Sequence, residues 1–368
     1  MKDESIIKVL WLAPHFNHYK ARFLNSLQKH GRINLFIYAG ETSINKGYAQ
    51  FDIPEMEFEL RKTNVPKASF GHSLKVLCDV FKWHHQEKFD WIMVPCEAKN
   101  FFLVLFLSVL RFFCNYRLFS YNHAVLGTGK KNTLLSKLMY CFYNRIVFYT
   151  ENERRRALDL RLLSPSKAFF ANNTLDNIAI NKCYSFHIKD LGKPTLLFIG
   201  RLIPNKQIEL LLHYHQRLKN ILPELKLLII GDGPEAPIVQ KALKSDLSIQ
   251  WFGALSDEGE ISPIMQKANA VINLGASGLS VMHSFAYGKP YIAIENPQNG
   301  PECWYLRSGY NGLLLKSGND YVEYNAREIV SMLNNTSQYE LLCKGAYETA
   351  QKYSVQAWVE EITECLTK

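Results

Sequence analysis

The feature that most constrains the fold is an alternation of apolar, strand-like runs with segments of helical period along the whole chain. The strand-like runs form two series. The first consists of KVLWLA, INLFIYA, DWIMVP, RLFSYN, RIVFYT and KAFFAN, and the second of TLLFIGR, LKLLIIG, IQWFG, AVINL, PYIAI and GLLLK. Strands that alternate with helices are typical of a parallel sheet covered on both faces. The sequence therefore predicts an α/β protein with two doubly wound, Rossmann-like domains.

The two series are separated by a polar segment of weak periodicity, residues 178–193. The chain has 368 residues, of which 47% are hydrophobic, and this is enough for two separate cores. We expect an N-terminal domain over residues 1–185 and a C-terminal domain over 186–352. In such folds ligands bind beyond the carboxyl ends of the strands, so two facing sets of loops would form a cleft between the domains.

Cysteines and apolar runs indicate the compartment. The eight cysteines show no C-x-x-C spacing, which favours a reducing cytosol over a disulfide framework or a zinc site. The N-terminus carries acids where a secretory signal carries positive charge. The most apolar stretch, Phe101–Tyr116, is interrupted by Arg111 and is shorter than the ~20 residues of a bilayer span. We expect it to form a buried helix.

Positive charge is concentrated in the first half. Up to Ser185 the chain has 26 Lys and Arg against 15 Asp and Glu, while the remainder has 17 against 19. A solvated surface explains such a balance, but it also favours an anionic membrane surface or a phosphate-bearing substrate. Nucleic acid is not an expected partner, because no basic stripe is interleaved with aromatic residues.

Polar side chains follow several strands of the first series. They are candidates for contacts to a ligand, although a histidine after an apolar strand can also be purely structural. The candidates in these loops are His15, Asn17, His18, Glu97, Asn100 and His123.

In the second half, two loops have the chemistry to hold a diphosphate. GRLIPNK places Arg201 and Lys206 where both cations can converge on one ligand, although solvated surface cations are the alternative. GASG precedes an expected helix whose first N–H groups lack partners. Its small residues allow an anion to approach or allow the helix to pack tightly on a sheet. GDGPE, with Gly233, is a weaker signal of the same kind. ENPQNGPE, a later loop of the second half, adds Glu302 to the polar candidates for ligand contacts.

Several well-defined motifs are missing from the sequence. It has no G-x-x-x-x-G-K-[ST], H-E-x-x-H or G-x-S-x-G, which argues against a P-loop nucleotidase, a zincin and an α/β-hydrolase. It also has no D-x-D pair that would clamp a metal ion. We expect neither a metal nor another cofactor.

The order of the second-half signals resembles that of the retaining glycosyltransferases of family four, which have the two-domain fold called GT-B. The matching segments are FIGRLIPNKQIELLL, LLIIGDGPE, WFGAL, ANAVINLGASGLSVMHSFAYGKP and GPECWYLRSGYNGLLL. In the first half, YNHAVLGT, IVFYTENER and ANNTLDN resemble a bacterial subgroup that builds surface polysaccharides. The last segment, residues 353–368, resembles the family's closing helix, which returns to the first domain.

The resemblance implies roles for individual residues. Arg201 and Lys206 match the pair that neutralises the diphosphate of the sugar nucleotide and the departing nucleotide, and Gly200 lies beside them. His123 matches a histidine near the transferred sugar. The resemblance also makes the other polar loop candidates, Glu302 among them, candidates for contacts to the sugar or the acceptor. The helix start whose N–H groups hold the phosphate is matched by Gly278, Leu279 and Ser280.

The sequence departs from the family at one motif. Most members carry E-x7-E, in which the first glutamate contacts the donor sugar and the second the ribose, but this chain has Gly275 and His283 there. A branch of the family with histidine at the second position is consistent with activity. We predict that His283 hydrogen-bonds the ribose of a bound nucleotide.

Together these signals predict a metal-independent retaining glycosyltransferase. Its donor is expected to be a UDP- or GDP-sugar and its acceptor a lipid-linked or other oligosaccharide in cell-surface polysaccharide synthesis. The expected location is the inner face of the cytoplasmic membrane, bound peripherally. Two alternatives stay open: a sugar-nucleotide epimerase or hydrolase of the same fold, and a non-catalytic subunit that binds nucleotide or glycan.

Overall fold

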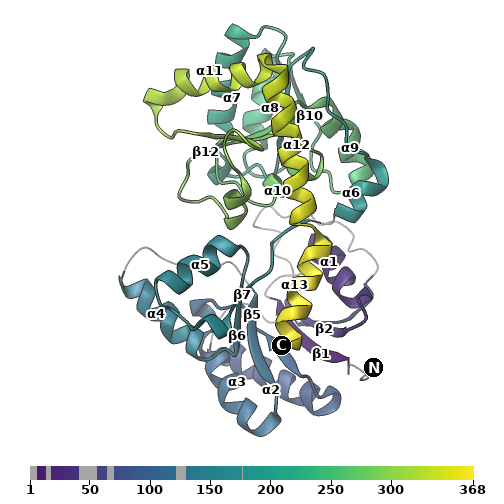
Figure 1. Ribbon diagram of the computed structural model, residues 1–368, viewed down its shortest axis with the longest axis vertical. Coiled ribbons are helices and arrows are strands. Elements are labelled where there is room, and N and C mark those ends of the chain that lie inside the picture. The colour runs from purple at the N-terminus through teal and green to yellow at the C-terminus, as the bar shows by residue number, and fades with distance from the viewer. Residues whose placement is uncertain (1–5, 14–17, 41–55, 64–69, 122–129, 176) are drawn as a thin grey trace. The chain divides into compact units, whose positions relative to one another are not determined.

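The structure is a computed structural model that describes residues 6–13, 18–40, 56–63, 70–121, 130–175 and 177–368. The contacts among these residues divide the chain into two units (Figure 1). Unit 1 comprises the described residues up to Asn173 together with Val355–Lys368, and unit 2 comprises the described residues of Thr174–Ser354.

The described part of unit 1 forms a seven-stranded parallel sheet with the strand order β3-β2-β1-β4-β5-β6-β7. Its strands are β1 (Ile7–Ala13), β2 (Ile33–Gly40), β3 (Glu59–Thr63), β4 (Trp91–Met93), β5 (Arg117–Tyr121), β6 (Arg145–Phe148) and β7 (Ala168–Phe170). Its helices are α1 (His18–Lys29), α2 (Phe70–Glu87), α3 (Phe101–Cys114), α4 (Lys130–Cys141), α5 (Glu151–Asp159) and α13 (Val355–Thr367), with short 3₁₀ turns η2 (Ala98–Asn100) and η3 (Pro165–Lys167).

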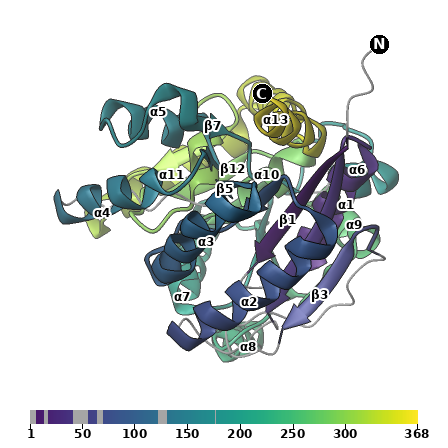
Figure 2. The same cartoon turned by 90° about the horizontal axis from the view of Figure 1, so that it is seen from below.

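Apolar side chains cover both faces of this sheet, as expected for strands that are buried on two sides. On one face α1 and α13 pack together, and Trp358 of α13 lies edge-on to Phe23 with 4.7 Å between the ring centroids. Trp91 also donates a hydrogen bond from Nε1 to the carbonyl of Leu366, at 3.1 Å. On the other face lie α2, α3 and α4 (Figure 2). Helix α13 is therefore part of the core of unit 1.

The described part of unit 2 forms a six-stranded parallel sheet with the order β10-β9-β8-β11-β12-β13. Its strands are β8 (Thr195–Ile199), β9 (Lys226–Ile230), β10 (Ile249–Trp251), β11 (Ala270–Asn273), β12 (Tyr291–Ile294) and β13 (Gly312–Leu315). Its helices are α6 (Asn177–Cys183), α7 (Ile208–Ile221), α8 (Ala236–Ser245), α9 (Glu258–Lys267), α10 (Ser280–Ala286), α11 (Val322–Asn334) and α12 (Thr336–Lys352), with 3₁₀ turns η4 (Pro204–Lys206), η5 (Pro301–Tyr305) and η6 (Asn319–Tyr321).

Helices also cover both faces of the second sheet. Helices α7, α8 and α11 contribute to the core on one face, and α6, α9, α10 and α12 contribute to the core on the other. The strands β8, β11 and β12 are buried along their whole length, which explains why they appear in the sequence as continuous apolar runs. The prediction of two doubly wound α/β domains is confirmed.

Two local features differ from the sequence prediction. Strand β3 was not predicted, because its ELRKT segment is charged and the ion pair between Glu59 and Arg61 lies on an edge strand, where charge protects against pairing with another sheet. The division of contacts falls between residues 173 and 174 rather than after 185, because α6 packs against α9 of unit 2.

The apolar stretch of the first half forms α3, which buries Leu103, Val104, Leu107 and Ser108 against the sheet. Among the described residues, no helix combines the length and the apolar character that crossing a membrane requires. Some of the apolar side chains of α3 are nevertheless exposed, above all Phe112 and Phe113, at 79% and 82%.

Candidate functional site

Two loops of unit 2 meet at the point where the direction of winding reverses. Strands β8 and β11 are neighbours, but β8 leads into α7 on one face of the sheet and β11 leads into α10 on the other. Such a topological switch point is where doubly wound sheets bind ligands. The loop after β8 contains Arg201 and Lys206, and the loop after β11 contains Gly275 and Gly278. The sequence signals for a diphosphate are therefore brought to one place.

Backbone contact between the two loops explains the glycine at 275. The N–H of Ala276 donates to the carbonyl of Asn205 at 2.7 Å. A Cβ atom on residue 275 would lie 2.4 Å from that same carbonyl oxygen and 2.4 Å from the carbonyl carbon of Lys206. Any side chain at 275 would thus force the loops apart, which accounts for the absence of a glutamate at this position.

Lys206 is tied directly to the loop after β11, because its Nζ donates a hydrogen bond to the carbonyl of Ala276. Burial, and next the neighbouring positive charge of Arg201, lowers the pKa of Lys206 to about 8, although the carboxylate of Glu302 acts in the opposite direction. Lys206 and Arg201 are therefore close enough to repel one another. Two cations held together in this way favour an anion that both can contact.

The loop before α10 is fixed by polar side chains that sequence reasoning missed. The Ser277 N–H donates to Oδ1 of Asn299 at 2.9 Å, and Asn273 Oδ1 accepts from the Gly275 N–H at 3.1 Å. The hydroxyl of the buried Tyr291 donates to Ser277 Oγ at 3.1 Å and lies 2.7 Å from Ser280 Oγ. The contacts of Ser277 and Ser280 come from residues 11 to 22 positions further along the chain, so no local motif predicts them.

Glu302 lies at the same switch point, on η5, and is 4% exposed. A Cβ atom on Gly278 would be 3.7 Å from its Oε2, and its charge acts on Lys206. The structure therefore brings Glu302 together with Gly278 and Lys206, and its predicted contact to a sugar or an acceptor stays a prediction.

His283 lies one turn after the start of α10, because its N–H donates to the carbonyl of Leu279 at 3.0 Å. Its ring Nε2 is 3.2 Å from both carboxylate oxygens of Glu258, the first residue of α9. The hydroxyl of Tyr287 donates to Glu258 Oε2 at 2.8 Å. Sequence reasoning missed Glu258, whose only local signal is its place after the helix-capping Asp257.

The remaining donor-binding candidates lie around these loops. Gly200 directly follows β8, Leu279 is the N-cap of α10, and Ser280 is the first residue of that helix. Gly233 has a packing role of its own, because a Cβ atom there would lie 2.4 Å from the carbonyl oxygen of Leu202. The predicted contacts of these residues to a nucleotide stay predictions.

The candidates of unit 1 are only partly within the described residues. Asn100 donates from Nδ2 to the carbonyl of Pro95 at 2.9 Å, and Glu97 pairs with Lys99, so both are held locally in and beside η2. His15, Asn17 and His123 lie outside the described residues, and His18 begins α1 with a side chain that is not described.

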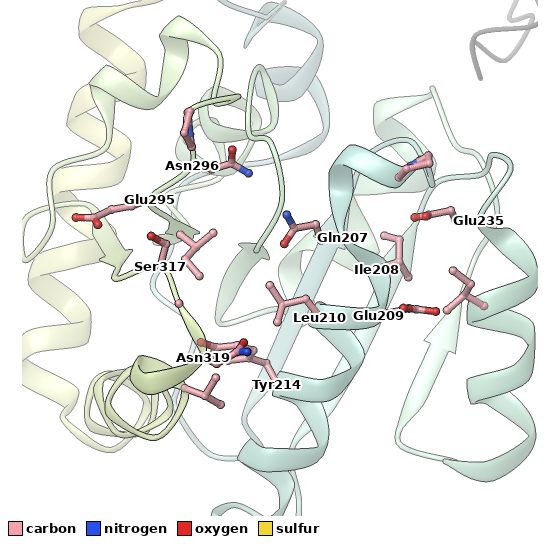
Figure 3. A pocket seen from close by; sticks show the side chains of 16 residues that line it. Gln207, Ile208, Glu209, Leu210, Tyr214, Glu235, Glu295, Asn296, Ser317 and Asn319 are labelled. Carbon is pink, nitrogen blue, oxygen red and sulfur yellow. The ribbon is translucent and has the colours of Figure 1, made fainter.

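A separate pocket of about 680 Å³ lies between α7, α8 and the loops after β12 and β13. Figure 3 shows the side chains of Gln207 and Asn296 on facing sides of it. None of the predicted donor residues lines this pocket. Its lining residues are Pro204, Gln207, Ile208, Glu209, Leu210, Tyr214, Glu235, Ile238, Ile294, Glu295, Asn296, Pro297, Ser317, Gly318, Asn319 and Val322.

Metal-ligating side chains do not gather in the part of the chain that the structure describes: no group of three or more His, Cys, Asp or Glu residues there has the arrangement to hold an ion. Metal independence stays a prediction.

Comparison with known proteins gives a family match for part of the chain. No curated protein matches the chain by sequence. Residues 193–335 match the family model described as glycosyl transferases group 1. The matched segment contains Arg201, Lys206, Gly278, His283 and Glu302, so it includes both loops of the switch point.

Solved structures resemble the chain over almost its full length. Anabaena HepE in complex with UDP and glucose has a TM-score of 0.68 and 16% identity, with 98% of this chain and 100% of HepE covered. A glycosyltransferase from Rickettsia africae has a TM-score of 0.73 and 14% identity, with 98% of each chain covered. The lipopolysaccharide outer core galactosyltransferase WaaB has a TM-score of 0.67 and 15% identity, with 98% of this chain and 99% of WaaB covered. These likenesses confirm the GT-B fold.

Proposed function

We propose that this protein is a retaining glycosyltransferase that moves a sugar from a nucleotide diphosphate to a hydroxyl of a lipid-linked glycan, in cell-surface polysaccharide synthesis. The observation that carries the proposal is the meeting of Arg201 and Lys206 with the loop before α10 at the switch point, inside the segment that matches the glycosyltransferase family model. The complex of HepE with UDP and glucose supports a uridine nucleotide as the first donor to test.

In the proposed reaction, the bond between the anomeric carbon and the β-phosphate oxygen breaks, and a bond from that carbon to the acceptor oxygen forms. The nucleoside diphosphate leaves with the bonding electrons, and the acceptor hydroxyl releases a proton. Negative charge therefore grows on the diphosphate in the transition state. Cations held near it in advance stabilise that state more than they stabilise the substrate, and Arg201 and Lys206 supply the positive charge.

We assign the contact with the donor's ribose to His283. The ring lies one helical turn beyond Leu279, so it is near the start of α10 and the phosphate-binding loop. An imidazole nitrogen can hydrogen-bond one ribose hydroxyl. Lys206, Arg201 and His283 would then contact successive parts of a nucleoside diphosphate.

A panel of UDP- and GDP-sugars, incubated with the protein with and without a lipid-diphosphate acceptor, tests the proposal. We expect release of free nucleoside diphosphate that depends on the acceptor. Release without an acceptor would identify a hydrolase, and a changed sugar on an intact nucleotide would identify an epimerase. Binding of a nucleotide sugar with no turnover under any condition would identify a non-catalytic subunit.

We also propose that unit 1 binds an anionic membrane surface through α3 and α4. On α3, Phe112 and Phe113 are 79% and 82% exposed, and on α4, Leu134 is 71% exposed. Neither helix contains Asp or Glu, whereas both contain Lys or Arg. Exposed aromatic and aliphatic side chains together with positive charge are typical of surfaces that bind anionic lipid.

Sedimentation with vesicles tests this surface. We expect binding to vesicles that contain an anionic lipid and release as salt shortens the Debye length to about 8 Å or less. Replacing Phe112 and Phe113 together by Ser should weaken the binding, whereas the same change at the exposed Leu247 of unit 2 should not. Equal binding to neutral vesicles would attribute the interaction to apolar contact alone, and no binding to either would contradict the proposal.

A further inference from the structure

The carboxylate of Glu258 lies beside the helix that carries His283. It comes from a different element, α9, and lies 3.2 Å from His283 Nε2. The side chains are 13% and 11% exposed, so both groups are largely removed from water. A hydrogen bond to a charged group in such surroundings is stronger than an exposed one.

Glu258 is itself held in place from two directions. The Tyr287 hydroxyl donates to its Oε2 at 2.8 Å. Burial, and next the charge of Glu258 and this hydrogen bond, raise the pKa of Tyr287 well above its usual value. The backbone of Glu258 begins α9 directly after Asp257, whose side chain caps the helix by accepting from the Gly259 N–H at 2.6 Å. Glu258 therefore has a fixed position against which the imidazole can be oriented.

The contact determines which nitrogen of the ring carries the proton. An ionised carboxylate can only accept hydrogen bonds, so a neutral His283 beside it bears its proton on Nε2. Nδ1 is then the nitrogen with the lone pair. A ring in this tautomer accepts a hydrogen bond from a ligand hydroxyl, as the carboxylate of a glutamate at the same position would.

We propose that Glu258 is a positioning residue that fixes His283 in the Nε2–H tautomer and thereby makes it a hydrogen-bond acceptor for a ribose hydroxyl. The inference rests on the proposed function for the identity of the ligand, but its first part concerns the protein alone. Glu258, on helix α9, thus enables His283 to accept a hydrogen bond from the ligand, as a glutamate at residue 283 would.

The tautomer is measured first, without any ligand, by NMR of protein labelled with ¹⁵N in its histidine rings. The chain has 11 histidines, and the variant His283→Gln identifies the signals of His283. We expect the proton on Nε2 in the wild type and in Glu258→Gln, which keeps an acceptor oxygen, and a mixture of tautomers in Glu258→Ala. The control Tyr310→Phe, which removes a tyrosine–glutamate hydrogen bond elsewhere in unit 2, from Tyr310 to Glu348, should keep the wild-type pattern. A proton on Nδ1 in the wild type would overturn the proposal.

Affinity is measured next, by calorimetry with UDP and with 2′,3′-dideoxy-UDP. Glu258→Ala should weaken UDP binding by roughly 2- to 13-fold, the range for one hydrogen bond. It should leave the dideoxy analogue unaffected, and Glu258→Gln should restore the UDP affinity. Equal losses for both ligands would reduce Glu258 to a structural role. If neither UDP nor GDP binds the wild type, the proposed function and the ribose contact fail together, while the ring spectra still decide whether Glu258 sets the tautomer.

Discussion

At the scale of single residues, the site depends most on Lys206. Its ammonium group donates a hydrogen bond to the Ala276 carbonyl, and the charges of Arg201 and Glu302 both act on its pKa. In the free protein the buried ammonium and the nearby guanidinium oppose one another. A bound diphosphate would relieve that repulsion and stabilise the charged form of Lys206.

Loss of either cation should therefore weaken nucleotide binding. A hydrogen bond to a charged group contributes on the order of 1.5–3 kcal/mol, so Arg201→Ala and Lys206→Ala should each lower the affinity for UDP by roughly 10-fold or more. Calorimetry measures the effect, and Lys226→Ala, at an exposed position of β9, provides a matched control. Near-wild-type titrations of both variants would show that the two cations are solvated surface groups.

The same affinity should depend on pH. Because the pKa of Lys206 is about 8 in the free protein, the side chain loses its proton as the pH rises through this value. We expect UDP affinity to fall between pH about 7 and about 9.5, a range in which a terminal phosphate with a pKa near 6 is already ionised. Lys206→Arg, which stays charged, should show a much flatter profile. An equally steep profile in that variant would assign the titration to another group.

At the scale of elements, long apolar runs predicted the strands most reliably. Strands such as β8 and β11, which are buried throughout, were predicted from sequence because burial on both sides demands a continuous run of apolar residues. The edge strand β3 has a charged sequence without a continuous apolar run, so it was not predicted. Within the site, the loop residues Arg201 and Lys206 were predicted, whereas Glu258 and Tyr291 were not, because they reach α10 from other elements.

The turn after α10 contains a buried lysine, Lys289, whose effect on stability can be tested. Lys289 is 1% exposed, and among the described residues its Nζ has no hydrogen-bond partner. Burial lowers its pKa from 10.5 to about 8. An unpartnered buried amine is destabilising, so this lysine weakens unit 2 at neutral pH.

Lys289→Met, which keeps the length of the side chain, should raise the free energy of unfolding at pH 7 by roughly 1–3 kcal/mol. Between pH 8 and 10.5 the unfolded chain binds more protons than the folded one, so the stability of the wild type rises with pH across this window. The advantage of the variant should shrink accordingly. Denaturant unfolding at pH 7 and at pH about 10 measures this, and a variant less stable than the wild type at pH 7 would contradict it.

At the scale of the whole molecule, the proposed function is supported by different observations in the two units. Unit 2 contains the whole of the segment that matches the glycosyltransferase family model, residues 193–335, together with the cations of the switch point. Unit 1 is matched through its fold and adds the exposed apolar side chains of α3 and α4. The alternation of strands and helices sufficed to predict both sheets except for the edge strand β3. The ligand could not be predicted in the same way, because sugar and acceptor are selected by side chains from several loops.

The most direct test of the central proposal is transfer by the whole protein in excess chelator. The assay follows release of nucleoside diphosphate from the donor that the panel identifies, with a lipid-diphosphate acceptor present, and determines the anomeric configuration of the product by NMR. Because Arg201 and Lys206 are proposed to supply the positive charge, we expect turnover to be undiminished by EDTA and the product to keep the configuration of the donor. Activity that EDTA abolishes and magnesium or manganese restores, or a product of inverted configuration, would contradict the proposal.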